Sequence, residues 1–138
     1  MTWPFNKTDT KLEQAESTLS PFIITALSGV DGQVFPDQIE TSRLAKCYVY
    51  GAIRYLASYD DMRPASFNAL AQTMLGRYFD LDSNEVDKSL TYLSEIKHGG
   101  KEQLFMIEGA SALRRWLVNG DRNVAGDLKN MLNSGRPN

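Results

Sequence analysis

The sequence predicts an all-α protein, a single compact bundle of about six helices around a central apolar helix at residues 37–58. Three observations favour this class. Apolar residues recur at spacings of three and four along most of the chain, which is the helical period. No stretch shows the sustained period-two alternation of a half-buried strand. Turn and capping residues separate the periodic segments. The whole chain, residues 1–138, reads as one helical domain, with loose tails at residues 1–8 and 134–138.

The first predicted helix precedes the central one, and its apolar residues keep helical spacing over residues 12–30. Pro21 interrupts this run, and Ser20 before it is a natural N-cap. We therefore expect either one kinked helix or two short helices, ending at Gly29.

The central helix is predicted at residues 37–58. Pro36 suits the start of a helix, where its missing N–H has no helical partner. Asp37 and Glu40 place negative charge at the positive end of the helix dipole. Gly51 inside the helix costs about 1 kcal/mol relative to Ala, which indicates close approach of another helix. The apolar surface covers more than half the circumference, so neighbours should pack on several sides; its main stripe is Ala45, Tyr48, Val49, Ala52, Ile53 and Leu56.

Three or four more helices follow. Ser66 is the expected cap of a third helix, and the apolar residues of a fourth run over residues 86–96. The turn His98-Gly99-Gly100 separates the fourth helix from a fifth at residues 101–118. Asp121 is the expected cap of a last short helix.

One turn imitates a calcium-binding loop. Asp80, Asp82 and Asn84 occupy the positions of the first three calcium ligands. Glu85 stands where such a loop needs glycine, however, and Thr91 stands where it needs the bidentate glutamate. We interpret this segment as a helix cap followed by acids of the first turn.

The amino-acid composition limits which classes of partner and location fit this chain. The chain is 42% apolar and 23% charged, as ordinary globular proteins are, and its net charge of −2 is spread along the sequence. Neither nucleic acid nor an anionic membrane is therefore an expected partner. No apolar run is long enough to span a membrane, and the N-terminus lacks the pattern of a signal peptide, so a cytoplasmic location is expected. The one cysteine, Cys47, is predicted to be a buried apolar residue.

Two titratable residues are candidates for chemistry, His98 and Glu108. His98 is the only histidine, which excludes a metal site built from several histidines of one chain. Glu108 lies beside the apolar stripe of the fifth helix, and its predicted role is to pair with a base such as Arg54 or with a tyrosine. The alternative is an enzyme that uses a buried Glu108 with a shifted pKa. No cofactor is expected.

The segment FIITALSGVDGQVFPDQIE, residues 22–40, resembles the helix–turn–helix of TerB-like proteins, the tellurite-resistance-type helical family. Asp31 and Gly32 match the Asp-Gly turn of that family, and Asp37 matches an acid that opens the next helix. Gln38 stands where the family pattern has a glutamate, and no second turn of this kind occurs. The resemblance implies a helical bundle in stress response or interaction, with Asp31 and Asp37 as ligands of a divalent metal.

The sequence favours a non-catalytic helical protein that acts through contact with another protein or with a second copy of itself. Tyrosine and arginine are frequent at the centres of interfaces. The expected contact residues are an aromatic pair in the N-terminal tail and the narrow polar face of the central helix: Trp3, Phe5, Arg43, Lys46, Tyr50 and Arg54. The alternatives that stay open are the TerB-like metal-binding module and the enzyme that uses Glu108.

Overall fold

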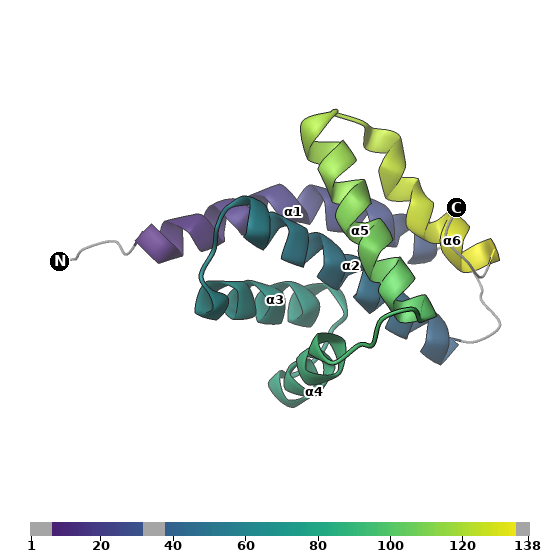
Figure 1. The fold of residues 1–138 in the computed structure, drawn as a ribbon, viewed down its shortest axis with the longest axis horizontal. Helices are drawn as coiled ribbons and strands as arrows, with labels where there is room; N and C mark the ends of the chain where they lie inside the picture. Colours follow the sequence, from purple (N-terminus) through teal and green to yellow (C-terminus); the bar gives the residue numbers. More distant parts are fainter. Residues whose placement is uncertain (1–6, 32–37, 135–138) are drawn as a thin grey trace.

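The computed structural model describes residues 7–31 and 38–134 (Figure 1). Within these ranges the chain forms six α-helices and one 3₁₀ helix, without strands. Their bounds are α1 Lys7–Asp31, α2 Gln38–Tyr59, α3 Pro64–Tyr78, α4 Ser83–Ser94, α5 Lys101–Val118, η1 Arg122–Gly126 and α6 Asp127–Ser134. The predicted all-α class is confirmed, and the central helix expected at residues 37–58 is α2.

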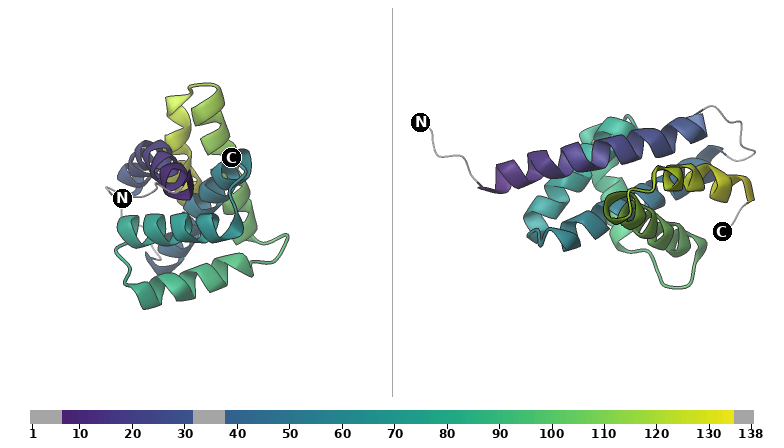
Figure 2. Two further views of the ribbon diagram at one scale, coloured as in Figure 1. Left: turned by 90° about the vertical axis from the view of Figure 1, so that its left-hand side faces the viewer. Right: turned by 90° about the horizontal axis from the view of Figure 1, so that it is seen from above.

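Helix α2 lies at the centre of the fold. It contacts α1, α3, α5 and α6, and Figure 2 shows α1 on one side of it and α5 on the other. Every residue from Cys47 to Ile53 is buried, because neighbouring helices cover this part of α2 on all sides. The closest neighbour is α5. A Cβ atom on Gly51 would lie 1.9 Å from the carbonyl oxygen of Met106, so the close approach predicted from Gly51 is confirmed.

Buried residues from every helix form one hydrophobic cluster. Its aromatic centre joins α1, α2 and α5. The ring of Phe22 stacks on Tyr48 at 6.1 Å between centroids and meets the edge of Trp116 at 5.6 Å. Aromatic contacts of this kind add to the free energy of burial, so they fix α1 against the crossing of α2 and α5.

Helix α1 runs without interruption from Lys7 to Asp31, with Pro21 inside it. The alternative of two short helices is therefore wrong, as is the expected end at Gly29, and the helix takes in the last two residues of the predicted tail 1–8. Ser20 is no cap, because it lies inside this helix, and its hydroxyl accepts a 2.8 Å hydrogen bond from Tyr78. Burial of the apolar side of α1 outweighs the one hydrogen bond that a proline removes.

Helices α3 and α4 form a hairpin at one side of the molecule (Figure 2). Helix α3 begins at Pro64 with Arg63 as N-cap residue, so the prediction that Ser66 caps it is wrong; proline suits the first helical turn better than an interior position. Helix α4 begins after Asp82. The Asp82 carboxylate accepts from the Glu85 amide at 2.8 Å, and the Glu85 carboxylate accepts from the Asp82 amide at 3.0 Å. This capping box confirms the interpretation of the turn as a cap.

The C-terminal part of the chain consists of α5, the 3₁₀ helix η1 and α6. Helix α5 has the predicted bounds, but Asp121 caps a 3₁₀ helix that precedes α6 rather than α6 itself, with its carboxylate accepting from the Asn123 amide at 3.1 Å. The guanidinium of Arg122 lies over the ring of Trp116, 4.2 Å from its centroid. This cation–π contact holds the 3₁₀ helix against α5.

Candidate functional site

A groove of about 520 Å³ lies between the first half of α2 and the second half of α4. We call it the α2–α4 groove. The residues that define its character are Ile39, Arg43 and Lys46 on α2 and Lys88, Tyr92 and Leu93 on α4. Most of its surface is apolar, and three of these six side chains are basic.

Local helix geometry directs the side chains of the groove to one side. Arg43 and Lys46 are three residues apart on α2, and Lys88 and Tyr92 are four residues apart on α4, so each pair shares a helix face. Leu93 is buried and forms part of the floor. The capping box at the start of α4 fixes where the register of that helix begins. The groove therefore depends on two helices that are far apart in the sequence.

One acidic side chain ties the groove to α5. The Glu102 carboxylate accepts a 2.6 Å hydrogen bond from the Tyr92 hydroxyl and lies 3.7 Å from the Arg43 guanidinium. The hydrogen bond lowers the pKa of Glu102 below its usual value and raises the pKa of Tyr92 to about 12. Both shifts keep Tyr92 protonated, as the donor, and Glu102 ionised, as the acceptor. Tyr92 is thereby held in place at the edge of the groove.

The two lysines of the groove lack such a partner. Among the described residues, no carboxylate forms an ion pair with Lys46 or Lys88. The ammonium of Lys46 lies 5.9 Å from the centroid of the Phe79 ring, and no acid of the described residues forms an ion pair with it. The groove is thus locally basic, although the chain as a whole is acidic.

The structure divides the predicted polar face of α2. Arg43 and Lys46 line the α2–α4 groove. Tyr50 is only 5% exposed and its ring packs on Phe67 at 5.7 Å between centroids, so its assignment to an exposed face is wrong: α3 covers this side of α2. Arg54, one turn further, lies at a different pocket.

The side chains of four predicted site residues lie outside the described part of the chain. Trp3, Phe5 and Asp37 lie outside the described residues, and for Asp31 only the helical backbone is described. Among the residues that the structure describes, no group of three or more His, Cys, Asp or Glu side chains could hold a metal ion. The metal and tail hypotheses stay predictions.

Glu108 is half-buried on α5, but the expected ion pair with Arg54 is not formed. The Arg54 guanidinium instead donates to the sulfur of Met106 at 3.2 Å. The Glu108 charge lies close enough to the Tyr48 hydroxyl to contribute to that group's raised pKa, of which burial is the main cause. Glu108 does not line the pocket at which Arg54 lies.

Sequence reasoning missed Ile39, Lys88 and Tyr92. Ile39 and Tyr92 could have been noticed as large apolar residues outside the periodic stripes of their helices, since such residues either meet another element or stay exposed. Lys88 carries no signal of its own in a polar helix. Ile39 shares the α2 face of Arg43 and Lys46, which follow it by four and seven residues, whereas the position of Lys88 and Tyr92 opposite them follows only from where α4 lies beside α2.

Comparisons with known proteins give no match to any family model, curated protein or solved structure. The resemblance of residues 22–40 to TerB-like proteins therefore stays a prediction. None of the helices over residues 7–31 and 38–134 has the length and apolar character needed to cross a membrane.

Proposed function

We propose that this protein is a non-catalytic interaction module that binds an acidic, amphipathic helical segment of a partner protein in the α2–α4 groove. The observation that carries the proposal is the combination of an apolar groove with lysines that no described carboxylate neutralises.

The apolar part of the groove supplies a hydrophobic driving force for binding. Ile39 is 82% exposed and Tyr92 is 42% exposed, although both are large apolar side chains beside a groove. Covering them removes apolar surface from water, which favours association. Tyr92 is held by its bond to Glu102, so it loses little rotamer freedom when a partner covers it.

The charges of the groove select the partner. Glu102 partly compensates Arg43, whereas Lys46 and Lys88 have no described carboxylate in an ion pair. Carboxylates of a partner segment would meet these two ammonium groups at the two walls of the groove. A basic segment would meet like charge, which disfavours the wrong partner.

The shape of the groove favours a helix as its occupant. A channel between two helices with an apolar floor accepts the apolar side of a third helix, whose anchors recur at spacings of three, four and seven residues. The partner segment therefore needs apolar residues on one side and Asp or Glu beside them.

A peptide-display selection tests the proposal. The full-length protein is used to enrich a library of random helical peptides, and the affinity of the selected peptides is then measured by fluorescence anisotropy. We expect acidic peptides with helically spaced apolar anchors. The double variant Lys46→Glu/Lys88→Glu should weaken their binding by at least about tenfold, because two attractions become repulsions.

The control is Lys97→Glu, which makes one such charge reversal on the exposed connection between α4 and α5, outside the groove. It should leave the affinity within about twofold. The proposal fails if the library yields no acidic peptides, or if the double variant binds them as well as the control does. A concentration-dependent dimer that the double variant abolishes, without peptide enrichment, would assign the groove to a second copy of this chain instead.

A further inference from the structure

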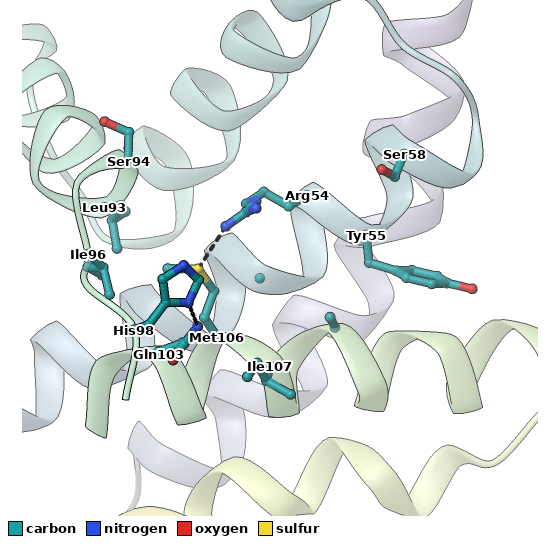
Figure 3. Close-up of a pocket in the computed structure, with 12 residues that line it drawn as sticks. Arg54, Tyr55, Ser58, Leu93, Ser94, Ile96, His98, Gln103, Met106 and Ile107 are labelled. Carbon is teal, nitrogen blue, oxygen red and sulfur yellow. Dashed lines mark hydrogen bonds between the residues drawn. The ribbon is translucent and has the colours of Figure 1, made fainter. Parts of the chain in front are cut away.

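A second pocket, of about 530 Å³, lies between α2, the end of α4 and the first half of α5 (Figure 3). We call it the His98 pocket. The only histidine of the chain and Arg54 both line it. Figure 3 shows these two side chains directed toward one another from different elements, His98 from the turn before α5 and Arg54 from α2.

Two hydrogen bonds of the Gln103 side chain indicate which ring nitrogen of His98 carries the proton. The side-chain oxygen of Gln103 accepts from the Gly99 amide at 2.5 Å, and its nitrogen lies 2.6 Å from Nδ1 of His98. An amide nitrogen can only donate, so Nδ1 is the acceptor and the proton of the neutral ring is on Nε2. In Figure 3 the ring nitrogen that is not bonded to Gln103 lies on the side of Arg54. The pocket therefore receives an N–H donor in a fixed orientation.

Arg54 supplies a charged donor on the same side. Its guanidinium donates to the Met106 sulfur at 3.2 Å, and thioether sulfur is a weak acceptor. No carboxylate of the described residues forms an ion pair with Arg54. A ligand oxygen that replaces the sulfur would therefore gain a stronger, charge-assisted hydrogen bond.

The rest of the lining is mixed. Tyr55, Met106 and Ile107 contribute apolar surface beside the hydroxyls of Ser58 and Ser94, and the described lining includes neither Asp nor Glu. The volume lies within the range of small-molecule sites, which combine apolar walls with a few convergent polar groups. We propose that the His98 pocket binds a small organic anion, with its carboxylate or phosphate between Arg54 and His98 and its apolar part against Tyr55 and Ile107. This site shares only the buried Leu93 with the α2–α4 groove and does not depend on the proposed function.

The test uses phenylbutyrate and phenyl phosphate as anionic probes, with phenylbutanol as the neutral analogue. Binding to the full-length protein is followed by calorimetry and by NMR shifts of the Arg54 and His98 side chains. We expect the better anion to bind with a low-millimolar or tighter Kd, and the alcohol at least about tenfold more weakly, since it cannot form the charge-assisted bonds. Which anion binds better distinguishes a carboxylate from a phosphate ligand.

Arg54→Gln should lower the affinity for the better anion at least about tenfold, and His98→Phe should lower it severalfold. Arg114→Gln removes an exposed arginine of α5 that does not line the pocket, so it should bind the anion as the unchanged protein does. Thermal unfolding of each variant verifies that it is folded. The proposal is overturned if neither anion binds, if the alcohol binds equally well, or if the folded Arg54→Gln variant retains full affinity.

Discussion

Gly51 on α2 and Gly109 on α5 form a reciprocal contact at the centre of the fold. A Cβ atom on Gly51 would lie 1.9 Å from the carbonyl oxygen of Met106, and one on Gly109 would lie 1.9 Å from that of Tyr48. Met106 precedes Gly109 by three residues, and Tyr48 precedes Gly51 by three. Each glycine therefore faces the backbone of the turn before the other glycine, and nothing but backbone separates the two helices there.

This contact predicts an unusual cost for a small substitution. Gly51→Ala or Gly109→Ala should lower the free energy of unfolding by about 2–3 kcal/mol, because backbone must move to make room. The gain in helix propensity, about 1 kcal/mol, acts in the opposite direction. Urea unfolding followed by circular dichroism measures the difference.

Gly76→Ala is the matched control for that experiment. Gly76 also lies within a helix, but its Cβ would meet the nearest atom, a methyl group of Val86, at 3.4 Å, an ordinary contact. The control should therefore be neutral or stabilised by up to about 1 kcal/mol. Equal effects at all three positions would contradict the backbone contact between α2 and α5.

The bond between Tyr92 and Glu102 predicts a pH dependence. The folded state lowers the pKa of Glu102, so this contribution to stability is present above the pKa of an unfolded glutamate and is lost as pH falls through the folded value. The pKa of Tyr92 is raised to about 12, so its contribution is complete below the pKa of an unfolded tyrosine, about 10, and is lost as pH rises through the folded value.

Tyr92→Phe should return the pKa of Glu102 toward the ordinary range of glutamate, as measured by NMR titration of its carboxyl carbon. The loss of stability at neutral pH should stay below about 1 kcal/mol, because water replaces the lost partner at this exposed position. Tyr59→Phe removes the hydroxyl of a more exposed tyrosine that is distant in sequence from this bond, and it should leave the titration unchanged. An unchanged titration in Tyr92→Phe would refute the role of the bond.

The capping box at the start of α4 can be tested separately. Asp82→Ala removes the acceptor for the Glu85 amide and should lower the free energy of unfolding by about 1 kcal/mol. Asp82→Asn keeps an oxygen acceptor, so its effect should be smaller. Thermal and urea unfolding of the pair measures this, and an Asn variant as unstable as the Ala variant would attribute the effect to charge instead of to the cap.

Cys47 should report on unfolding. The side chain is buried, and burial raises the pKa of its thiol to about 12. At about pH 8 almost no thiolate exists in the folded protein, and the sulfur is inaccessible to reagents. We expect a disulfide reagent to react far more slowly with the native chain than with the chain in guanidinium, at a rate that follows the population of open states. Labelling of the native chain at the speed of a free thiol would be inconsistent with this burial.

The sequence contains enough information for the helices but not for all of their ends. Helix α5 has the bounds that its flanking turns predict, whereas α1 continues through Pro21. Whether a helix ends at a proline or continues through it depends on how much of its surface the rest of the fold buries. A local sequence pattern does not contain that information. Tyr50 illustrates the same limit: helical period places it beside Arg43 and Lys46, but α3 covers it.

By itself the sequence determined the all-α class, the central position of α2 and the close approach at Gly51, because period, caps and an interior glycine are local signals. Only the tertiary structure decided which side chains meet. Lys88 and Tyr92 lie across a groove from Arg43 and Lys46, and His98 lies across a pocket from Arg54. These pairs are far apart in sequence, and their positions depend on how α5 packs against α2 and how α3 holds α4 beside it, which no local pattern specifies.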